Sequence, residues 1–465
     1  MRFELVKPQF VPPLDEGFRP AVLANRAFQA KVAVMPGGGV PLVLGLERAD
    51  GIISRFQTRV LPDDHPDATA NLPYVERLVK FLLWQRGAWK VYVGGSSVVA
   101  DHLAEVYSAD GARRFDYHFM GEQVYQHPFT VVGCAADKVP AANEVEKRQA
   151  LGRHLDGQRI GFDLGASDLK ISAVVDGEPI FSDEIVWEPV QQQDPDYHYQ
   201  RITAALKLAA SKLDRVDAIG GSSAGVYVDN RPMVASLFRG IPSERYDEVR
   251  NMFLRIRDEL GLPLEVINDG DVTALAGSMS LEDNGVLGIA MGSSEAVGYV
   301  ALDGNITGWL NELAFAPIDY QDNGAVDEWS GDKGVGAMYF SQQAVFRLAP
   351  KVGIELPDGE TNATKLKYVQ RYLEDGHPGA RQIWETMGCY LGYALAHYAD
   401  FYDLRHVLIL GRCTSGQGGP IMLETAQHVL QGEFPALAAA INLQLPDEKS
   451  RRVGQSIAAA SLPRL

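Results

Sequence analysis

The chain has 465 residues, of which 46% are hydrophobic and 22% are charged, and its formal net charge is −17. A chain of this length is expected to form two or three domains, and its composition is that of a globular protein. No apolar run approaches the roughly 20 residues of a membrane helix, no signal-peptide pattern is present, and the three cysteines lie too far apart for a disulfide framework or a metal cluster. We therefore expect a cytoplasmic protein with no membrane partner, and the lack of a basic stripe argues against a nucleic-acid partner.

The first third of the chain predicts an α/β domain that follows an extended arm. Residues 1–18 are rich in proline and form the arm, and apolar strands alternate with turns from Ala21 to Leu61. An apolar period near 3.6 predicts a helix over Asn71–Trp84, followed by a strand that begins at Lys90 and a helix over Val98–Tyr107. These elements predict a domain over residues 19–137, and the alanine- and charge-rich residues 138–158 predict a linker.

A β-hairpin that begins at Arg159 is the first segment with chemical character. An apolar strand leads into the turn Asp163-Leu-Gly-Ala-Ser-Asp168, and a second apolar strand follows it. Backbone N–H groups and the Ser167 hydroxyl of such a turn can bind a phosphate, and Asp163 can hold Mg²⁺ through water. The same composition also serves in turns that bind no ligand.

The rest of the chain alternates strands and helices. Polar or glycine-rich turns follow several of the strands. The predicted elements are a helix at 194–213, a strand with a Gly/Ser turn at 217–225, a helix at 243–260, a strand at 263–267 that ends in Asn268-Asp269, a helix at 272–279, strands at 285–291 and 296–302 joined by Gly292-Ser-Ser-Glu295, and a strand at 406–411 within a helical remainder.

Two segments of the first third are similar to two segments that come later in the chain. The stretch after Lys31 is similar in order and character to the one after Leu287, and the stretch after Lys90 to the one after His406. We interpret residues 19–137 as a shortened, degenerate copy of the C-terminal lobe that precedes a complete two-lobe unit. The alternative is that any two α/β segments are this similar.

The order of these signals predicts phosphoryl transfer. That reaction requires a nucleophile held in line, a base for its proton, and Mg²⁺ and N–H groups around the phosphates. The two hairpins at Asp163–Ser167 and Gly292–Ser294 and the isolated strand-end Asp269 supply these parts. For Asp269 the alternative is a helix N-cap.

The region from Arg159 onward, about two-thirds of the chain, resembles the ROK family (repressors, open reading frames and sugar kinases). The resemblance rests on Asp163-Leu-Gly-Ala-Ser-Asp-Leu-Lys170, on Ser223-Ala-Gly-Val-Tyr-Val-Asp229 and, most specifically, on Ile267-Asn-Asp-Gly-Asp-Val-Thr-Ala-Leu-Ala-Gly277. It implies an actin-like ATPase (ribonuclease H-like) α/β fold of two lobes, with the N-lobe at 159–282 and the C-lobe at 283–465. It also implies ATP and Mg²⁺ as cofactors and a sugar or polyol as the substrate.

The resemblance assigns roles to individual residues. Asp269 matches the family's general base. The matches for substrate binding are Asn268, Ser236, Glu312 and Glu328; those for nucleotide binding are Asp163, Gly165, Ser167, Gly292, Ser293, Gly411 and Gly416, with Asp163 also holding the metal. Ser236 stands in place of the family's sugar-contacting Asn.

Departures from the family pattern bear on activity. Phe315 replaces a sugar-binding His, and Asp322-Asn-Gly-Ala-Val-Asp327 replaces a cysteine-rich loop, so no zinc is expected. The hairpin after Gly292 lacks two of the family's glycines and carries Glu295, which we expect to be a solvated charge that opposes triphosphate binding. The ten histidines form no metal-ligand pair, and we expect Asp168 and Asp271 to be structural.

Three functions remain open from the sequence. The first is an ATP-dependent sugar or polyol kinase with Asp269 as its base. The second is a sugar sensor or scaffold with a decayed ATP site, which would not bind DNA because residues 1–137 offer no basic recognition helix. The third is another ATPase or phosphotransferase of the same superfamily. Because ROK proteins commonly pair through their C-terminal lobes, a fused half-copy would leave the chain a monomer, and the alternative is a homodimer.

Overall fold

The structure is a computed structural model that describes residues 3–144, 151–446 and 448–465. The chain forms two compact units. Unit 1 comprises residues 1–148, 289–296 and 308–445, and unit 2 comprises residues 149–288, 297–307 and 446–465. The predicted N-terminal domain thus falls in one unit with most of the predicted C-lobe, and the last twenty residues belong with the predicted N-lobe instead.

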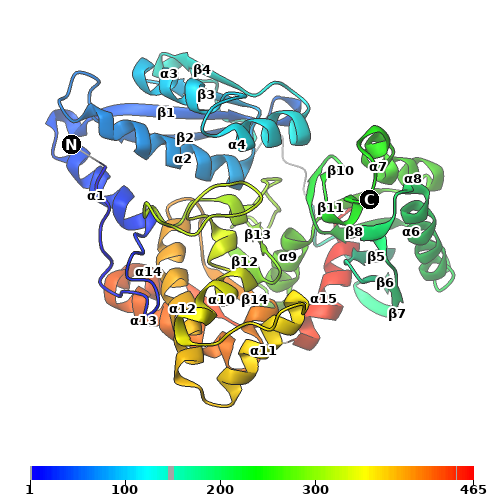
Figure 1. Ribbon diagram of the computed structural model, residues 1–465. Helices are drawn as coiled ribbons and strands as arrows, with labels where there is room; N and C mark the ends of the chain where they lie inside the picture. The colour runs from blue at the N-terminus through cyan, green and yellow to red at the C-terminus, as the bar shows by residue number, and fades with distance from the viewer. Residues whose placement is uncertain (1–2, 145–150, 447) are drawn as a thin grey trace. The chain divides into compact units, whose positions relative to one another are not determined.

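Unit 2 is built on a five-stranded sheet of order β11-β8-β5-β6-β7 (Figure 1). Strands β5, β6 and β7 form an antiparallel meander, and β5, β8 and β11 run parallel. The strand bounds are β5 Gln158–Leu164, β6 Asp168–Val175, β7 Glu178–Val186, β8 Ala218–Ser223 and β11 Leu264–Asn268, with a separate two-stranded ribbon of β9 Val226–Val228 and β10 Arg231–Val234. The hairpin predicted at Arg159 is therefore β5–β6.

Helices cover both faces of this sheet. The helices of unit 2 are α6 Pro195–Ala210, α7 Tyr246–Arg250, α8 Met252–Leu260, α9 Asp269–Leu281 and α15 Glu448–Ala460. Along β5, Ile160 and Phe162 enter the apolar core formed with α6 and α8, whereas Gly161 between them lies against α15. This alternation follows from the two-residue period of a strand. The contact with α15 is so close that a Cβ on Gly220 of β8 would lie 1.6 Å from the Ala459 carbonyl oxygen.

The N-terminal part of unit 1 is an α/β domain around a four-stranded sheet of order β2-β1-β3-β4. Its elements are α1 Ala21–Ala33, β1 Val40–Glu47, β2 Ile53–Val60, α2 Asn71–Arg86, β3 Lys90–Gly94, α3 Ser97–Val106, α4 Arg114–His118 and β4 Thr130–Cys134. The helix and strand predicted at Asn71 and Lys90 are confirmed. The prediction of alternating strands from Ala21 was wrong at its start, because Ala21–Ala33 is helical and buries its apolar side against α12.

The remainder of unit 1 surrounds a second sheet of order β13-β12-β14-β15. Its strands are β12 Val286–Met291, β13 Glu295–Val300, β14 His406–Leu410 and β15 Asn442–Gln444, and its helices are α10 Gln342–Leu348, α11 Asn362–Glu374, α12 Pro378–Tyr398, α13 Gly418–Glu433 and α14 Pro435–Ala440. The boundary between the two units passes through the hairpin β12–β13. Helix α12 is buried along most of its length and forms the core of this part.

The half-copy predicted for residues 19–137 is not confirmed. Its sheet has the same strand order as the C-terminal one, but β3 pairs with β1 in the antiparallel direction. In the C-terminal sheet the end of β12 at Met291 adjoins Gly411, which follows β14, so these two strands run in the same direction. Lys31, where the supposed copy began, lies in a helix. The apparent repeat arose because the two regions have similar turns, although the helices and strands that these turns connect differ.

The described part of the amino-terminal arm, residues 3–18, contains turns at 13–14 and 16–17 and packs against α12. The backbone N–H of Phe10 donates to the Tyr393 hydroxyl at 3.0 Å, and the Tyr390 hydroxyl donates to Asp15 at 2.7 Å. The arm therefore belongs to the core of unit 1.

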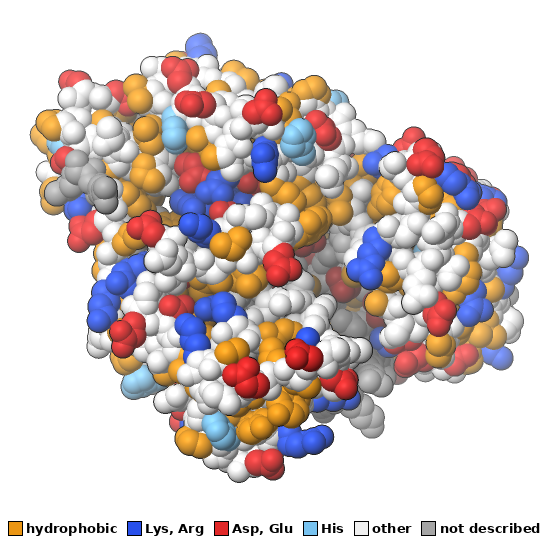
Figure 2. Space-filling view, viewed as in Figure 1, with side chains coloured by type: hydrophobic (Ala, Val, Ile, Leu, Met, Phe, Trp, Pro, Cys, Tyr) orange, Lys and Arg blue, Asp and Glu red, His pale blue; other side chains and the backbone are white. Residues whose placement is uncertain are grey.

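Within the described ranges, none of the helices is both long and apolar enough to pass through a bilayer. Figure 2 shows one face of the molecule, on which basic side chains are interspersed with acidic ones.

Candidate functional site

The carboxyl ends of three parallel strands bring the predicted catalytic residues of unit 2 to one edge of the sheet. The strand register places Leu164 of β5 beside Ser223 of β8, and Ser223 beside Asn268 of β11. Asp163 and Asp269 are one residue away from these positions and therefore lie at the same edge. Ligands of open α/β sheets bind at this edge.

Asp269 is the first residue of helix α9, after the N-cap position. The N-cap is Asn268, whose Oδ1 accepts from the Gly270 N–H at 2.7 Å and whose amide donates to the Gly225 carbonyl at 2.8 Å. The same Gly270 N–H also donates to Oδ1 of Asp269 at 3.0 Å, so the two side chains share this donor at the helix end. Shielding from solvent, and then the negative charge of Asp163, raise the pKa of Asp269 to about 6. A carboxylate of that pKa is ionised at neutral pH and basic enough to accept a proton.

Asp163 is 8% exposed and is held by two partners. The Ser222 hydroxyl donates to Oδ1 at 2.7 Å, and Lys170 Nζ lies 3.4 Å from Oδ2. Lys170 also pairs with Asp168 at 3.2 Å. Burial disfavours the charged form of Lys170, but the two carboxylates outweigh this effect and raise its pKa, so the ammonium stays charged.

Lys170 was not among the predicted site residues. The signal was available, because a hairpin that turns between Leu164 and Leu169 places Asp163 directly opposite Lys170. A cation in a phosphate-binding hairpin is a candidate phosphate ligand.

Two hydrogen bonds to the backbone of Gly165 and Asp168 hold the turn of the first hairpin. The Gly165 N–H donates to the Asp168 carbonyl at 2.9 Å, and the Trp187 indole N–H donates to the Gly165 carbonyl at 2.8 Å. Ser167 is exposed, and its hydroxyl donates to Asp168 at 2.9 Å. The turn is thus held firmly while the Ser167 side chain remains accessible.

The predicted substrate residue Ser236 is the neighbour in sequence of a residue that packs near this edge of the sheet. It is exposed and follows Ala235, which packs against Gly225, the residue whose carbonyl accepts from Asn268. Tyr227 was not predicted. Its hydroxyl donates to Ser223 at 2.7 Å, and the charge of Asp269 contributes to raising its pKa, although burial is the larger cause.

Unit 1 holds the other predicted nucleotide residues. The Gly292 carbonyl, at the tip of β12–β13, accepts from the Gln342 N–H at 2.9 Å, and a Cβ on Gly411 would lie 2.4 Å from the Met291 carbonyl oxygen. Gly292 and Gly411 are therefore neighbours, and Ser293 is exposed beside them. Gly411 and Gly416 both have positive φ, which explains glycine at these two positions.

Glu295 was expected to be a solvated charge, and this prediction was wrong. The residue is 3% exposed, and one carboxyl oxygen is packed against Gly336, where a Cβ would overlap it. Neither oxygen has a hydrogen-bond partner of good geometry, and Tyr398 lies near enough to interact electrostatically. Burial, and to a lesser degree the charge of Glu312, raise the pKa of Glu295 to about 8. The group is mostly neutral at pH 7, so the charge objection to triphosphate binding is removed.

The predicted sugar ligands of unit 1 occupy two neighbouring segments. Glu312 is half-buried and precedes the short turn Leu313–Phe315, and its N–H donates to the Trp84 carbonyl at 2.9 Å. Glu328 is exposed on the loop Asp322–Lys333. The rings of Phe315 and Trp329, the residue after Glu328, have centroids 5.1 Å apart. The aromatic contact therefore brings the two segments together.

A metal ion would have few protein ligands here. Among the residues that the structure describes, no group of three His, Cys, Asp or Glu side chains is arranged to hold one. Asp163 fits the more limited role expected of it, because Mg²⁺ in nucleotide sites keeps several waters and uses one or two carboxylates.

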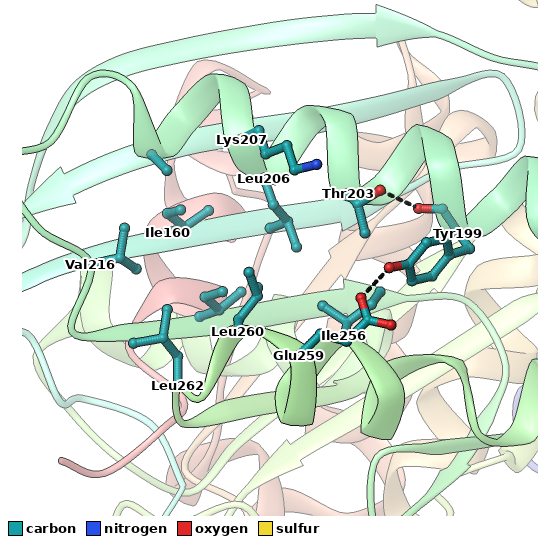
Figure 3. Close-up of a pocket in the computed structure, with 12 residues that line it drawn as sticks. Ile160, Tyr199, Thr203, Leu206, Lys207, Val216, Ile256, Glu259, Leu260 and Leu262 are labelled. Atoms are coloured by element: carbon teal, nitrogen blue, oxygen red, sulfur yellow. Dashed lines mark hydrogen bonds between the residues drawn. The ribbon is translucent and has the colours of Figure 1, made fainter.

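A separate hollow of unit 2 contains none of the predicted site residues. It has a volume of about 110 Å³ and lies between α6 and α8, with Ile160, Leu206 and Ile256 among its apolar walls (Figure 3). At its end the Tyr199 hydroxyl donates to Glu259.

The comparisons with known proteins concern the fold. No protein-family model and no curated protein matches the sequence. Among solved structures, a ROK family transcriptional regulator described as a homologue of the E. coli MLC protein matches with a TM-score of 0.53 and 20% identity, over 69% of this chain and 82% of the regulator. A ROK hexokinase from Thermus thermophilus matches with a TM-score of 0.51 and 18% identity, over 65% of this chain and 97% of the hexokinase. The predicted actin-like ATPase fold is confirmed for the part of the chain that matches these ROK structures, which is 69% of it in the first case and 65% in the second.

Proposed function

We propose that the protein is a kinase that transfers the γ-phosphoryl group of ATP to a hydroxyl of a sugar or polyol, with Asp269 as the general base. The observation that carries the proposal is the position of Asp269. It follows the parallel strand β11, is shielded from solvent, and has a pKa of about 6 beside Asp163. A surface carboxylate would have none of these properties.

The residues of unit 2 supply the parts of the reaction. Asp269 accepts the proton of the attacking hydroxyl as the new P–O bond forms and the bond to the ADP oxygen breaks. Asn268, fixed by its two hydrogen bonds, orients the substrate hydroxyl. Lys170 and the turn Gly165–Ser167 bind phosphate oxygens. Asp163 would hold Mg²⁺ through water, and the ion would offset the charge of the phosphates.

The residues of unit 1 complete the assignment. Gly292, Ser293, Gly411 and Gly416 are proposed to contact the nucleotide, and Glu312 and Glu328, together with Ser236 of unit 2, to accept hydrogen bonds from substrate hydroxyls. The neutral state of Glu295 supports nucleotide binding at the second hairpin. We place the protein in the cytoplasm, without a nucleic-acid or membrane partner.

A second candidate is a sugar sensor without kinase activity. The second hairpin has side chains where close backbone approach to phosphates favours glycine, and one structural relative is described as a transcriptional regulator. The idea that an N-terminal half-copy imitates a partner subunit loses its basis with the antiparallel pairing of β1 and β3. Either candidate can function as a monomer or as a homodimer.

Ligand-induced thermal stabilisation tests the proposal. Wild type and Asp269→Asn are heated with Mg²⁺-ATP, and with glucose, mannose, galactose and sorbitol, and the ligands that raise Tm are then assayed for phosphate transfer. The kinase predicts stabilisation by ATP and by one sugar or polyol, with transfer lost in Asp269→Asn. Stabilisation by a sugar alone would support the sensor, and hydrolysis of ATP without any sugar would support an ATPase.

A further inference from the structure

The loop Asp322–Lys333 carries Glu328 and is anchored by buried charges. The Asp327 N–H donates to the Asp332 carbonyl at 2.8 Å, which closes the loop and leaves Glu328 and Trp329 at its tip. Asp327 also accepts from the Ser330 N–H at 2.7 Å. A tip closed by its own hydrogen bonds in this way has little freedom to rearrange.

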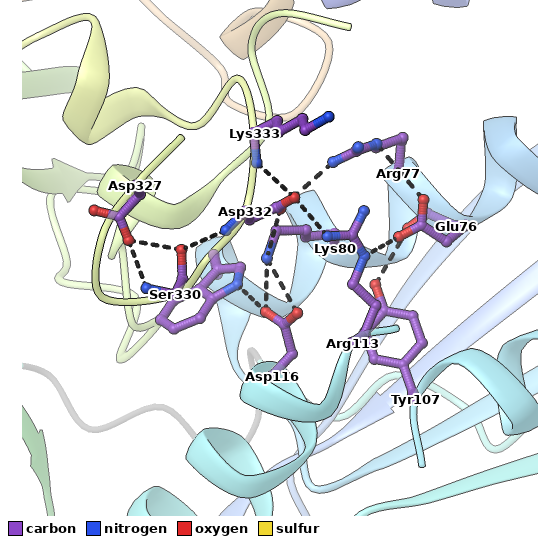
Figure 4. Close-up of polar contacts among 11 residues, drawn as sticks. Glu76, Arg77, Lys80, Tyr107, Arg113, Asp116, Asp327, Ser330, Asp332 and Lys333 are labelled. Atoms are coloured by element: carbon purple, nitrogen blue, oxygen red, sulfur yellow. Dashed lines mark hydrogen bonds and ion pairs between the residues drawn. The ribbon is translucent and has the colours of Figure 1, made fainter. Parts of the chain in front are cut away.

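The N-terminal domain holds the loop through Asp332 (Figure 4). Arg113 lies 2.7 Å and Lys80 3.1 Å from its carboxylate. Lys80 is 1% exposed and also pairs with Asp116 at 2.8 Å, and Asp116 accepts from the Trp84 indole N–H. Burial alone would raise the pKa of Asp332, but Lys80, Arg113 and Arg77 outweigh it and lower the pKa well below its usual range. The anchor is therefore charged at any physiological pH.

Trp329 stands out on this rigid loop because 57% of it is exposed. Three aromatic rings nevertheless fix its orientation: Phe115 at 5.4 Å, Phe119 at 5.8 Å and Phe315 at 5.1 Å, all at steep interplanar angles. Val326, on the same loop, is 47% exposed. An exposed indole that is held in place by its neighbours is characteristic of a binding surface.

The surroundings of Trp329 indicate the chemistry of the ligand. Glu328 precedes it, and Glu312 starts the turn whose last residue, Phe315, contacts its ring. Carboxylates accept hydrogen bonds from hydroxyls, and an aromatic face packs against C–H groups. A sugar ring offers both, since its hydroxyls lie at its rim and its C–H groups on its faces. A purely polar ligand would contact only the carboxylates, and a purely apolar ligand would contact only the indole ring.

We propose that Trp329 is a specificity-determining residue on which one apolar face of the substrate sugar ring stacks, in a loop that the N-terminal domain holds in place. This inference rests on the proposed function and names a residue for its substrate site. It gives the N-terminal domain a role, because Phe115, Phe119, Lys80 and Arg113 all support the loop from that domain. It also agrees with the presence of Phe315 where the ROK resemblance expects a His. At this position the sugar would meet an aromatic ring and not a hydrogen-bonding imidazole.

Calorimetric titration of the full chain with the sugars and polyol of the thermal panel tests the inference. Trp329→Ala should weaken the binding of the recognised sugar at least tenfold, and Trp329→Phe, which keeps an aromatic face, should weaken it less than threefold. Val326→Ala is the matched control, because it removes exposed apolar surface from the same loop without removing a ring, and should leave Kd unchanged. Because Trp329 is exposed, its replacement is not expected to prevent folding, and circular dichroism verifies this.

The outcomes separate the inference from the function on which it rests. If wild type binds and phosphorylates a sugar but Trp329→Ala binds it equally well, the stacking role is overturned and the kinase stands. Equal losses in Trp329→Ala and Trp329→Phe would also overturn it, because an aromatic face would then be of no use. If wild type binds no sugar or polyol, the proposed function and the inference are overturned together.

Discussion

Lys170 stands directly opposite Asp163 in the β5–β6 hairpin, with 3.4 Å between its ammonium nitrogen and the nearer carboxylate oxygen. Lys170 places its ammonium group in β6, next to the turn that is proposed to bind phosphate. Asp163 and Asp168 keep that charge in place by raising the pKa of Lys170, so the cation is present before a nucleotide arrives. Preorganised charge of this kind favours binding because no side chain has to be ordered at that moment.

Replacement of Lys170 by Met should therefore weaken nucleotide binding. A charge-assisted hydrogen bond contributes about 1.5–3 kcal/mol, which corresponds to a roughly tenfold to hundredfold increase in the KM for ATP. Lys212→Met, at an exposed lysine of the same unit, is the control and should leave this KM unchanged. An unaltered KM in Lys170→Met would exclude a phosphate contact.

The role proposed for Asp269 predicts that the rate of phosphate transfer depends on pH. The base must be ionised, so kcat/KM should fall about tenfold for each pH unit below the pKa of about 6. Asp269→Asn should lower kcat by about 10²–10⁴ while sugar binding persists, and the exposed Asp258→Asn should have no effect. A steady-state profile with no acid limb between pH 5 and 7 would contradict the assignment.

Replacement of the neighbouring Asp163 tests the cause of the raised pKa of Asp269. Its negative charge is one cause of the raised pKa of Asp269, after shielding from solvent. Asp163→Asn should therefore move the pKa of Asp269 downward, toward the ordinary range of an aspartate. Carboxyl-carbon NMR of the labelled protein follows this titration even where Asp163→Asn has lost activity.

Local pattern was sufficient to predict much of the site. The hairpin at Asp163 and the strand that ends in Asn268-Asp269 are set by short-range alternation and turn chemistry, and both were placed correctly. That the two segments end at the same edge of the sheet was not predicted, and the strand register shows it. The position of Lys170 could have been predicted in the same way. That prediction requires the register of the β5–β6 hairpin, which pairs Lys170 with Asp163, and not only the presence of the hairpin.

The features that could not be predicted from the sequence depend on packing between residues far apart in the chain. Glu295 occupies a hairpin start that is usually solvated, and its burial depends on Gly336 and Tyr398, far along the chain. Helix α1 contains several alanines, and its pairing with α12 selects the buried side. The strand direction that distinguishes the two four-stranded sheets is likewise a tertiary property, so similar turns could not reveal it.

Gly220 should not accept a larger residue. Its Cβ position lies 1.6 Å from the Ala459 carbonyl oxygen of α15, so Gly220→Ala requires the helix to shift and should cost about 1–3 kcal/mol or more of the free energy of unfolding. Gly288→Ala is the matched strand control, because the nearest atoms there are 3.6 Å away, an ordinary contact. Urea denaturation of the two variants should separate them, and equal stabilities would contradict the close packing of α15.

Lys80 should be essential to the stability of unit 1. Lys80→Met leaves Asp116 and Asp332 without their shared buried cation and should lower the free energy of unfolding by about 3–5 kcal/mol. Adding Asp116→Asn removes one uncompensated charge and keeps an acceptor for the Trp84 indole, so the double variant should recover part of the loss. The exposed Lys138→Met provides the control. A double variant less stable than Lys80→Met would show that Asp116 is compensated in another way.

Glu295 should make stability decline as the pH rises. Its pKa is about 8 in the folded protein against 4.5 for an exposed glutamate, so the folded state retains a proton that the unfolded chain loses between these values. The penalty is absent below pH 4.5, grows through neutral pH and levels off above pH 8, where it is on the order of 5 kcal/mol. Glu295→Gln, which resembles the neutral acid in shape, removes this titration. Relative to wild type it should therefore have a similar Tm at pH 5 and a higher Tm at pH 8.5, with the exposed Glu184→Gln as the control. A Tm difference that does not change between the two pH values would show that Glu295 is ionised in the folded protein, in which case its charge would again oppose a triphosphate at the second hairpin.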